Sequence, residues 1–388
     1  MRGQVLPITT RCGRVSTRPN DSQNLMTHVS SDSTSTGNRV RSIQYLRAIA
    51  ALSVVAYHAS KRVEGELSET AEALFHLGHG GVDLFFVISG FIMWSIGCNA
   101  PRRPGDFLLR RAVRVVPPYW IATLGWVAIM LVAGASWIVM TPAHVVMSLF
   151  LVPHWSPTFS NTFWPVLVPG WTLLFEMYFY ALFALTLLFA PQWRLMALTS
   201  LLLVMVAFGA AVPSNVAAVQ AYTSPLLLEF LAGCWIAELW RRGLAGFWLG
   251  IALCGVGFLV LIFLSPLAVP DETSWGRPLT FGLAGALIVA GSVALERFLP
   301  DLVWLEKLGD ASYAIYLFHM FIVVMLQNIW TALSIGTSGW SSAVFIAGCC
   351  VLASGLGLVL FAYVERPLQR WSLRRAAVIA TRPGVATR

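Results

Sequence analysis

Long apolar segments that recur along almost the whole chain constrain its fold more than any other sequence feature. A helix needs about 20 mainly apolar residues to cross the hydrocarbon core of a bilayer, which is about 30 Å thick. Ten segments meet this requirement, so we predict an all-α fold, a polytopic transmembrane helical bundle of about ten spans. The apolar stretch 143–152 is too short to cross and is predicted to be a re-entrant or interfacial piece. The predicted spans are 43–60, 79–98, 115–134, 171–190, 195–212, 224–240, 244–264, 278–295, 311–333 and 341–363.

The scarcity of charged residues excludes a conventional soluble enzyme. Only 11% of the 388 residues are charged and 57% are hydrophobic, whereas roughly 25% of an ordinary soluble domain is charged. The net charge of +8 does not indicate a nucleic-acid partner, because the basic residues flank the apolar segments. Six Cys residues lie mostly inside apolar segments and without CxxC spacing. We therefore predict neither a disulfide framework nor a metal site.

The distribution of Lys and Arg predicts how the bundle is oriented, since basic loops stay in the cytoplasm. With ten spans, 22 of the 26 basic residues lie on the side that holds the N-terminus. Lys61, Arg62 and Arg277 are the basic residues predicted on the opposite side, and Arg47 lies inside the first span. Both termini are therefore predicted to be cytoplasmic.

The composition divides the chain into three parts. Residues 1–41 are polar and rich in Ser, Thr and Arg, so we predict a disordered cytoplasmic tail. Residues 42–368 form the predicted transmembrane domain, and residues 369–388 form a basic cytoplasmic tail.

Ionisable residues inside the predicted spans are candidate functional groups, because each costs a few kcal/mol to insert into a bilayer. Counting along the spans places His58, Asp83 and Glu176 in the same outer third of the membrane, with His319 near the middle. Glu229 and Glu238 also lie inside a span, where helix packing or an interfacial position is the favoured explanation. Arg47 lies at the cytoplasmic face with Arg110, Arg111 and Arg114.

This arrangement suits the transfer of a group from an anionic cytoplasmic donor to an acceptor on the other side. Guanidinium groups bind phosphates in bidentate fashion, as the phosphates of coenzyme A require. A neutral His can remove the proton of an acceptor hydroxyl, and a neighbouring carboxylate can fix its tautomer. Two simpler explanations stay open: anionic lipid headgroups account for Arg110, Arg111 and Arg114, and an interhelical hydrogen bond accounts for His58.

Six short motifs occur in order between residues 43 and 370. They are RSIQYLRAIAALSVVAYHAS, where ten residues separate Arg47 from His58; GHGGVDLFFVISGFIMW, with Asp83, Ser89 and Gly90; RRAVRVVPPYW, with Arg111, Arg114, Pro117 and Tyr119; PGWTLLFEMYFY, with Trp171 and Glu176; SYAIYLFH, ending at His319; and YVERP. Together they resemble the Arg-x10-His, GVDxFFxxSGF, RxxR-x-x-P-x-Y, WSLxxE, SYxxYLxH and ERP motifs of the acyltransferase-3 family of integral membrane O-acyltransferases. Thr172 stands where that family usually has Ser, and it keeps the hydroxyl.

The resemblance implies O-acylation of carbohydrate, commonly acetyl transfer from acetyl-CoA to surface or exported polysaccharides. Bacterial exopolysaccharide and Nod-factor acetyltransferases are the most similar kinds of family member. The resemblance also implies that His58 is the catalytic residue and that Arg111 and Arg114 belong to a donor-binding element.

We therefore hypothesise a multi-pass O-acyltransferase of a bacterial inner membrane. Its donor would be acetyl-CoA or another acyl-CoA, and its acceptor a polysaccharide or a lipid-linked glycan. In this hypothesis the cofactor-binding residues Arg47, Arg111 and Arg114 hold the phosphates of coenzyme A. His58 is the general base, Asp83 or Glu176 assists it, and His319 orients the donor or relays a proton.

Aromatic residues in the predicted outer loops are candidate sugar-binding residues, and they also have a simpler explanation. Trp155, Trp164 and Trp171 could stack on sugar rings, although anchoring at the membrane interface accounts for them as well.

The alternative hypothesis is a proton-coupled transporter that exports a glycan or a lipid-linked sugar, in which the same His and carboxylate groups relay protons.

Overall fold

A computed structural model describes residues 40–370 apart from 64, 102, 135–137, 268–273, 337 and 338, and every regular element within these residues is helical. The predicted tail 1–41 and the basic tail 369–388 lie almost wholly outside the described residues. The α-helices are α1 (Arg41–Ser60), α2 (Glu69–His76), α3 (Gly81–Gly97), α4 (Pro104–Val132), α5 (Pro142–Leu149), α6 (Trp171–Thr186), α7 (Arg194–Ala211), α8 (Ala217–Tyr222), α9 (Leu227–Arg241), α10 (Phe247–Leu264), α11 (Leu283–Ala294), α12 (Val303–Ala332) and α13 (Gly339–Leu360).

Short 3₁₀ and π turns extend or join these helices. They are η2 (Leu77–Gly80), η3 (Val168–Gly170), η4 (Pro191–Trp193), η5 (Ser265–Leu267), η6 (Pro278–Gly282), η7 (Glu296–Phe298) and η8 (Phe361–Glu365). The turns η6 and η8 are π-helical, a form that occurs frequently at functional sites.

Seven helical stretches are long and apolar enough to cross a membrane, whereas the sequence predicts about ten spans. The other three predicted segments are also helical, but they are too short or not apolar enough to be counted as membrane spans. Polar residues lower the hydropathy of α1, α9 has only 15 residues, and the apolar stretch Pro278–Ala294 is a shorter helix. The seven are Glu69–Gly97, Pro104–Val132, Val168–Thr186, Pro191–Ala211, Phe247–Leu264, Val303–Ala332 and Gly339–Arg370.

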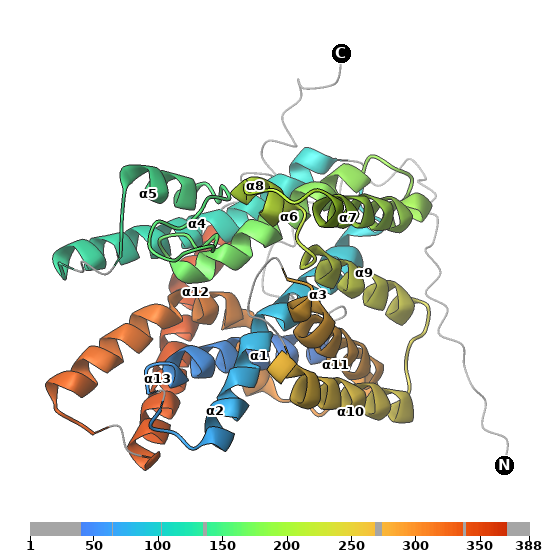
Figure 1. Ribbon diagram of the computed structural model, residues 1–388. Coiled ribbons are helices and arrows are strands. Elements are labelled where there is room, and N and C mark those ends of the chain that lie inside the picture. Colours follow the sequence, from blue (N-terminus) through green and yellow to red (C-terminus); the bar gives the residue numbers. More distant parts are fainter. Residues whose placement is uncertain are drawn as a thin grey trace, which may run out of the picture. The chain divides into compact units, whose positions relative to one another are not determined.

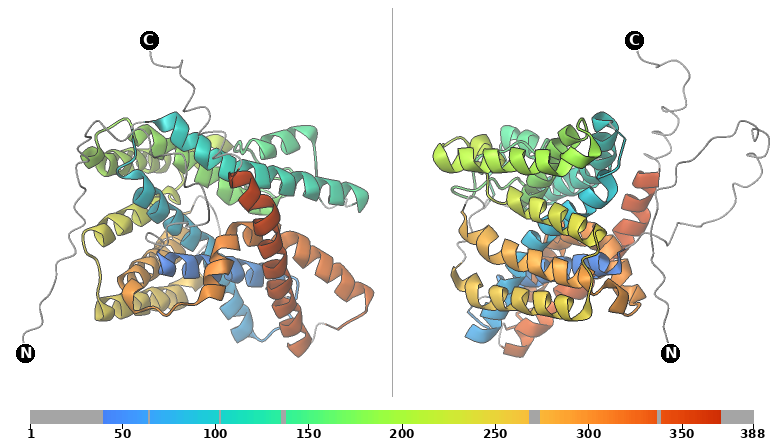
Figure 2. Two further views of the ribbon diagram at one scale, coloured as in Figure 1. Left: turned by 180° about the vertical axis from the view of Figure 1, so that it is seen from behind. Right: turned by 90° about the vertical axis from the view of Figure 1, so that its right-hand side faces the viewer.

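Helix α1 lies inside the bundle, which explains how it carries polar groups. It packs against α3, α11, α12 and α13 (Figure 1). The pairs α10/α11 and α12/α13 pack side by side at different margins of the bundle (Figure 2). At its margin α10 buries only Gly250 and Gly257 and exposes large apolar side chains such as Phe263, as a lipid-facing helix does.

Helices α3 and α9 pack so closely that their backbones nearly touch. An ideal Cβ on Gly90 would lie 1.9 Å from the carbonyl oxygen of Phe230, and one on Gly233 would lie 1.9 Å from that of Val87. Small residues allow this approach, which is how helices associate in membranes.

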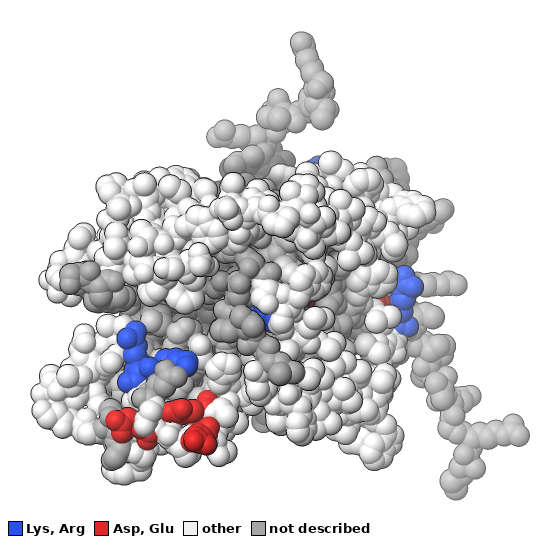
Figure 3. Space-filling model, viewed as in Figure 1, with Lys and Arg blue, Asp and Glu red and all other residues white. Residues whose placement is uncertain are grey.

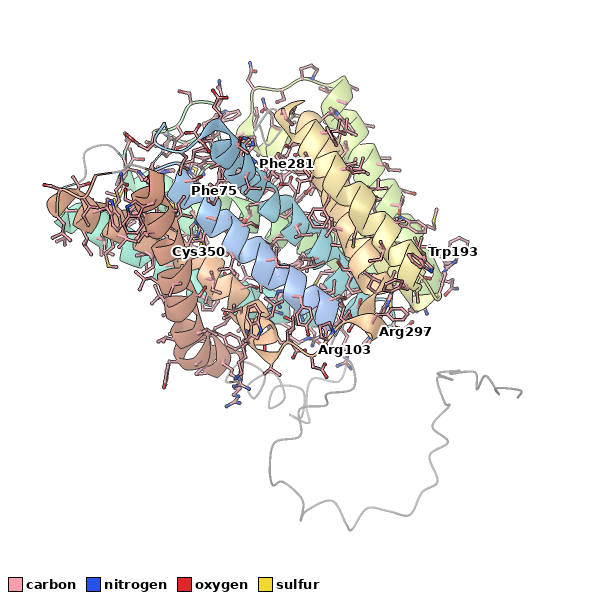
Figure 4. The ribbon with its side chains drawn as sticks, turned by 90° about the horizontal axis from the view of Figure 1, so that it is seen from below. Phe75, Arg103, Trp193, Phe281, Arg297 and Cys350 are labelled. Carbon is pink, nitrogen blue, oxygen red and sulfur yellow. The ribbon has the colours of Figure 1, made fainter. Side chains whose placement is uncertain are left out.

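The two ends of the bundle differ in their basic residues. Arg103 and Arg297 lie at one end, and Phe75 and Phe281 lie at the opposite end (Figure 4). Arg41, the first residue of α1, belongs to the first end because it forms ion pairs with Glu296 and Asp301. We call this the basic end.

Charged side chains cover little of the molecular face shown in Figure 3. The described residues on most of that face are neither acidic nor basic; basic groups gather near two of its edges, and acidic groups lie beside the basic group at the lower left. Such a surface suits contact with lipid.

Candidate active site

His58 and His319 are in contact between helices α1 and α12. His58 lies near the end of α1 that is far from the basic end, and His319 lies on α12. His319 Nε2 is 3.3 Å from His58 Nδ1, and His319 is fully buried. The two rings are tilted by 52° with their centroids 4.9 Å apart.

Backbone carbonyls determine which nitrogens carry protons, because a carbonyl oxygen only accepts. His319 Nδ1 lies 2.5 Å from the carbonyl oxygen of Tyr316 and therefore donates to it, so that its Nε2 is an acceptor. His58 Nδ1 lies 3.0 Å from the carbonyl oxygen of Val54, so it carries a proton shared between this carbonyl and His319 Nε2. The basic nitrogen of His58 is consequently Nε2, which has no hydrogen-bond partner among the described residues.

His319 lies farther along its helix than predicted, because α12 begins before the predicted span. A span that begins at residue 311 puts His319 well below His58. The helix instead begins at Val303, so His319 lies 16 residues from its start, and His58 lies 17 residues after Arg41. The two residues are therefore level, each about 25 Å along its helix.

A cavity of about 390 Å³ adjoins His58 and is lined by aromatic and aliphatic residues. We call it the His58 cavity. Its charged lining residues are Lys61 and Arg62, which follow α1. Its aromatic lining includes Tyr57, Trp126, Phe159, Trp164 and Trp171. Of the three tryptophans predicted to stack on sugars, Trp164 and Trp171 line this cavity, whereas Trp155 stacks on Phe163 and donates to the carbonyl of Asn215.

A second cavity, of about 90 Å³, extends from the same region toward the basic end. We call it the Arg47 channel. Arg47, from α1, and Arg114, from α4, line it together with Glu176. Arg47 is only 8% exposed, donates to Gln44 Oε1 and has Arg114, Glu365, Asp310 and Glu176 as its electrostatic neighbours.

The walls of the Arg47 channel follow one face of α3. Val82, Phe85, Ser89, Ile92 and Met93 all line it, at the three- and four-residue spacing of a single helix face. From Val82 to Met93 the channel runs along about 16 Å of this helix, given the rise per residue.

Glu176 belongs to the Arg47 channel and has no hydrogen bond to His58. It accepts a hydrogen bond of 3.1 Å from Ser89 and another from Tyr180. Depth alone, counted from the start of α6, predicts Glu176 beside His58, but its side chain lies on the part of α6 that lines the channel.

Asp83 forms a buried ion pair instead of contacting His58. Both of its carboxylate oxygens accept from Arg277, at 2.8 and 2.9 Å, and the two side chains are 0% and 1% exposed. Asp83 is adjacent in sequence to Val82 but faces away from the channel, on a different face of α3. The prediction placed Asp83 near His58 because it used only the depth of the residue in the membrane and not the face of the helix on which the residue lies.

The sequence prediction missed Arg277, which it left in an outer loop. This arginine also donates to His79 Nε2 at 3.2 Å and lies 5.2 Å from the ring centroid of Trp171. His79 and Trp171 both line the His58 cavity, so the Asp83–Arg277 pair supports two of its walls. The sequence does hold one signal for this pair: Asp83 lies inside a predicted span, and Arg277 is one of three basic residues predicted on the same outer side.

The remaining predicted residues lie outside the two cavities or at the edge of the channel. Arg111 does not line the Arg47 channel, packs over the ring of Phe107 and has a buried Nε with no hydrogen-bond partner among the described residues. Glu238 binds Trp94, Arg241 and Arg242, and Glu229 is buried beside the Asp83 pair. The described residues contain no group of three or more His, Cys, Asp or Glu side chains able to hold a metal ion.

Comparison with known families decides the class of this protein. A family model described as an acyltransferase domain matches residues 40–362. The chain belongs to the acyltransferase-3 family. This confirms the resemblance of the six motifs. Five of them lie on elements that line the His58 cavity or the Arg47 channel, whereas the sixth, YVERP, lies in η8 and just after it and lines neither space.

Relatives of this acyltransferase include proteins named for polysaccharide production and for O-acetyl transfer. It is 39% identical over 324 residues to the exopolysaccharide production protein ExoZ of Rhizobium meliloti (strain 1021), a match that covers 81% of this chain and 95% of ExoZ. It is 22% identical over 372 residues to the O-acetyltransferase OatA of Staphylococcus aureus (strain NCTC 8325 / PS 47), which covers 87% of this chain and 58% of OatA. No solved structure matches the acyltransferase.

Proposed function

We propose that this acyltransferase moves an acyl group, most simply acetyl, from acyl-CoA at the cytoplasmic end of a bacterial inner-membrane bundle to a hydroxyl of an exported carbohydrate. The observation that carries the proposal is the basic nitrogen of His58, a residue that lines a cavity of aromatic and aliphatic side chains next to a channel lined by Arg47 and Arg114. The similarity to ExoZ, named for exopolysaccharide production, supports the carbohydrate acceptor.

The orientation belongs to the same proposal. We place the basic end in the cytoplasm, with ten spans and both termini on that side. The positions of Arg103 and Arg297 support this orientation, since basic loops stay cytoplasmic. The helices α1, α9 and α11 would be the three additional spans, shielded from lipid by their neighbours, with local thinning of the bilayer matching the shorter ones.

Coenzyme A would bind at the basic end. Arg47 and Arg114 would hold its phosphates at the cytoplasmic mouth of the Arg47 channel, and Arg111 would contribute from the rim. The channel would then hold the pantetheine arm, where Ser89, Glu176 and Tyr180 offer polar contacts between apolar walls. In this reading Glu176 binds the donor and does not assist the base.

The acceptor hydroxyl would meet the thioester beside His58. His58 Nε2 takes the hydroxyl proton as the oxygen attacks the thioester carbon. The carbon–sulfur bond then breaks, the thiolate leaves, and the proton on His58 passes to that sulfur. The products are the O-acyl carbohydrate and free coenzyme A.

His319 takes the place that the prediction gave to a carboxylate. During the reaction His58 is cationic, and its Nδ1–H donates to His319 Nε2 and to the carbonyl of Val54. A fixed acceptor of this kind holds the tautomer and orientation of the base. Asp83 acts at a distance, by holding Arg277 against the cavity wall.

Family membership favours this proposal over the proton-coupled transporter. The test is acceptor-dependent release of free thiol by the purified, detergent-solubilised protein, with acetyl-CoA or succinyl-CoA as the donor and crude exopolysaccharide as the acceptor. His58→Ala should abolish it, and His76→Ala, a histidine outside the His58 cavity, is the matched control. Full activity in folded His58→Ala protein would refute the role of His58.

A further inference from the structure

The Arg47 channel and the His58 cavity share two lining residues, Val82 and Tyr316. The two spaces therefore meet at these side chains. Val82 is small and belongs to the wall of α3, whereas Tyr316 presents a large ring from α12. Tyr316 is only 6% exposed, so little open space remains at the meeting point.

The hydroxyl of Tyr316 is held on the opposite wall. It lies 2.9 Å from the carbonyl oxygen of Pro169 and 3.0 Å from Thr172 Oγ1, which is itself 3.1 Å from that carbonyl, so the two hydroxyl protons are shared among these three contacts. These partners lie in η3 and at the start of α6, so the hydrogen bonds join α12 across the junction. The ring also packs edge to face on Phe85, with the centroids 5.8 Å apart.

The backbone of Tyr316 has a separate task. Its carbonyl oxygen accepts the Nδ1 proton of His319 and so sets the tautomer of the histidine that supports His58. A rotation of the Tyr316 side chain would break its contacts with Pro169 and Thr172 but leave this carbonyl in place. The Tyr316 ring also contacts the ring of His319, with the centroids 5.9 Å apart, so opening the junction removes this contact but keeps the carbonyl hydrogen bond that sets the tautomer of His319.

We infer that the Tyr316 side chain separates the donor site from the acceptor site and is held in this closed position by its contacts with Pro169 and Thr172. We call this side chain the partition and these contacts the latch. The acylated pantetheine arm must rotate the Tyr316 side chain away to bring the thioester to His58. This inference rests on the proposed function. It gives the Thr172 hydroxyl a role and makes Tyr316 a positioning residue that limits contact between thioester and water. A closed partition keeps the donor from hydrolysis until it enters the His58 cavity.

Hydrolysis without acceptor measures how well the partition closes. Tyr316→Phe and Thr172→Val each remove latch hydrogen bonds and keep the side-chain size. Each should raise the ratio of acceptor-independent thiol release to acceptor-dependent transfer by up to roughly tenfold. One hydrogen bond contributes at most about 1.4 kcal/mol, which corresponds to a tenfold change in rate. Transfer itself should persist and still require His58.

Tyr119→Phe is the matched control. Tyr119 is fully buried, donates to the carbonyl of Ser148 at 2.8 Å, and lines neither the channel nor the cavity. Its ratio of hydrolysis to transfer should equal that of the wild type. The inference fails if Tyr316→Phe and Thr172→Val also keep the wild-type ratio. It fails equally if Tyr316→Phe abolishes transfer while coenzyme A still binds, because the hydroxyl would then be a catalytic group.

A second measurement does not need activity. Met320 lines the His58 cavity, so Met320→Cys, in a chain whose six native cysteines are replaced, reports access to that cavity. In inverted membrane vesicles a small membrane-impermeant thiosulfonate should label this cysteine slowly when Tyr316 is present and several times faster with Tyr316→Ala. Equal labelling rates would overturn the partition. If the proposed function is wrong, the wild type releases no thiol from any acyl-CoA, while this labelling comparison still decides the partition.

Discussion

At the scale of single residues, the histidine pair is the feature on which the proposed chemistry depends. In that chemistry His319 Nε2, 3.3 Å from His58 Nδ1, supports the protonated form of His58 in place of a carboxylate. His319→Ala should lower kcat about 10²-fold, a typical contribution of acid–base catalysis, and leave the KM for acyl-CoA unchanged, because the arginines lie at the other end of the channel. His319→Gln keeps an acceptor oxygen and should retain more of the rate. Steady-state thiol release with acceptor checks this, and a wild-type rate in His319→Ala would show that His58 needs no such partner.

The buried ion pair predicts a large effect on stability. Asp83→Asn would leave the guanidinium of Arg277 buried without its counter-charge, and should lower the free energy of unfolding by about 3 to 5 kcal/mol. The matched control is Asp106→Asn, because Asp106 pairs with Arg103 at the exposed surface, at 3.8 Å. That change should cost less than about 1 kcal/mol. Thermal unfolding in detergent compares the two, and equal losses would contradict the buried pair.

At the scale of helices, the contact between α3 and α9 depends on glycine. Gly90→Ala would place a methyl group against the Phe230 carbonyl and should destabilise the protein by about 1 to 3 kcal/mol. Gly255 on α10 has no atom within 4 Å of an ideal Cβ, so Gly255→Ala should be neutral or stabilise by up to about 1 kcal/mol. Thermal unfolding checks this, and Gly90→Ala should have a lower midpoint than Gly255→Ala. Similar midpoints would show that α3 and α9 can move apart without loss of stability.

Helix α5 and the loop after it predict a dependence on pH. Burial, and secondly the neighbouring His154, lower the pKa of His144 to about 4, and His144 Nδ1 lies 2.6 Å from His154 Nε2. The unfolded chain takes up this proton near pH 6.5 and the folded chain only near pH 4, so the contribution to stability is full above pH 6.5 and is lost as the pH falls toward 4. His144→Asn, which cannot titrate, should lose less stability over this interval than the wild type. Melting curves at several pH values test this, and parallel losses would exclude His144 as the source.

Helix ends explain most of what sequence could and could not predict. Each of the ten predicted apolar segments coincides with a helix, because the apolar pattern is what a bilayer requires. The starts of α4 and α12 are missed by 11 and eight residues, at Pro104 and Val303, because their first turns are polar and extend past the apolar stretch. The meeting of His319 with His58 was hidden by that error. The Asp83–Arg277 pair was hidden for another reason, since depth does not tell which face of a helix a residue occupies.

At the scale of the whole molecule, the structure joins two chemically different spaces within one bundle. Arginines line the channel toward the basic end, aromatic residues line the cavity around His58, and Tyr316 lies where the two spaces meet. In the proposed function the channel receives the anionic donor from one side, and the cavity receives the carbohydrate acceptor from the other. The proposed reaction is therefore transfer from one side of the membrane to the other, and turnover of a thioester alone would not demonstrate it.

The most direct measurement uses inverted membrane vesicles that contain the carbohydrate acceptor only in the lumen and receive radiolabelled acetyl-CoA only outside. Our account predicts that label appears on the luminal carbohydrate with the wild type and His76→Ala, and does not appear with His58→Ala. Label on the luminal carbohydrate at the wild-type level with His58→Ala, or transfer only when donor and acceptor share one side, would contradict it.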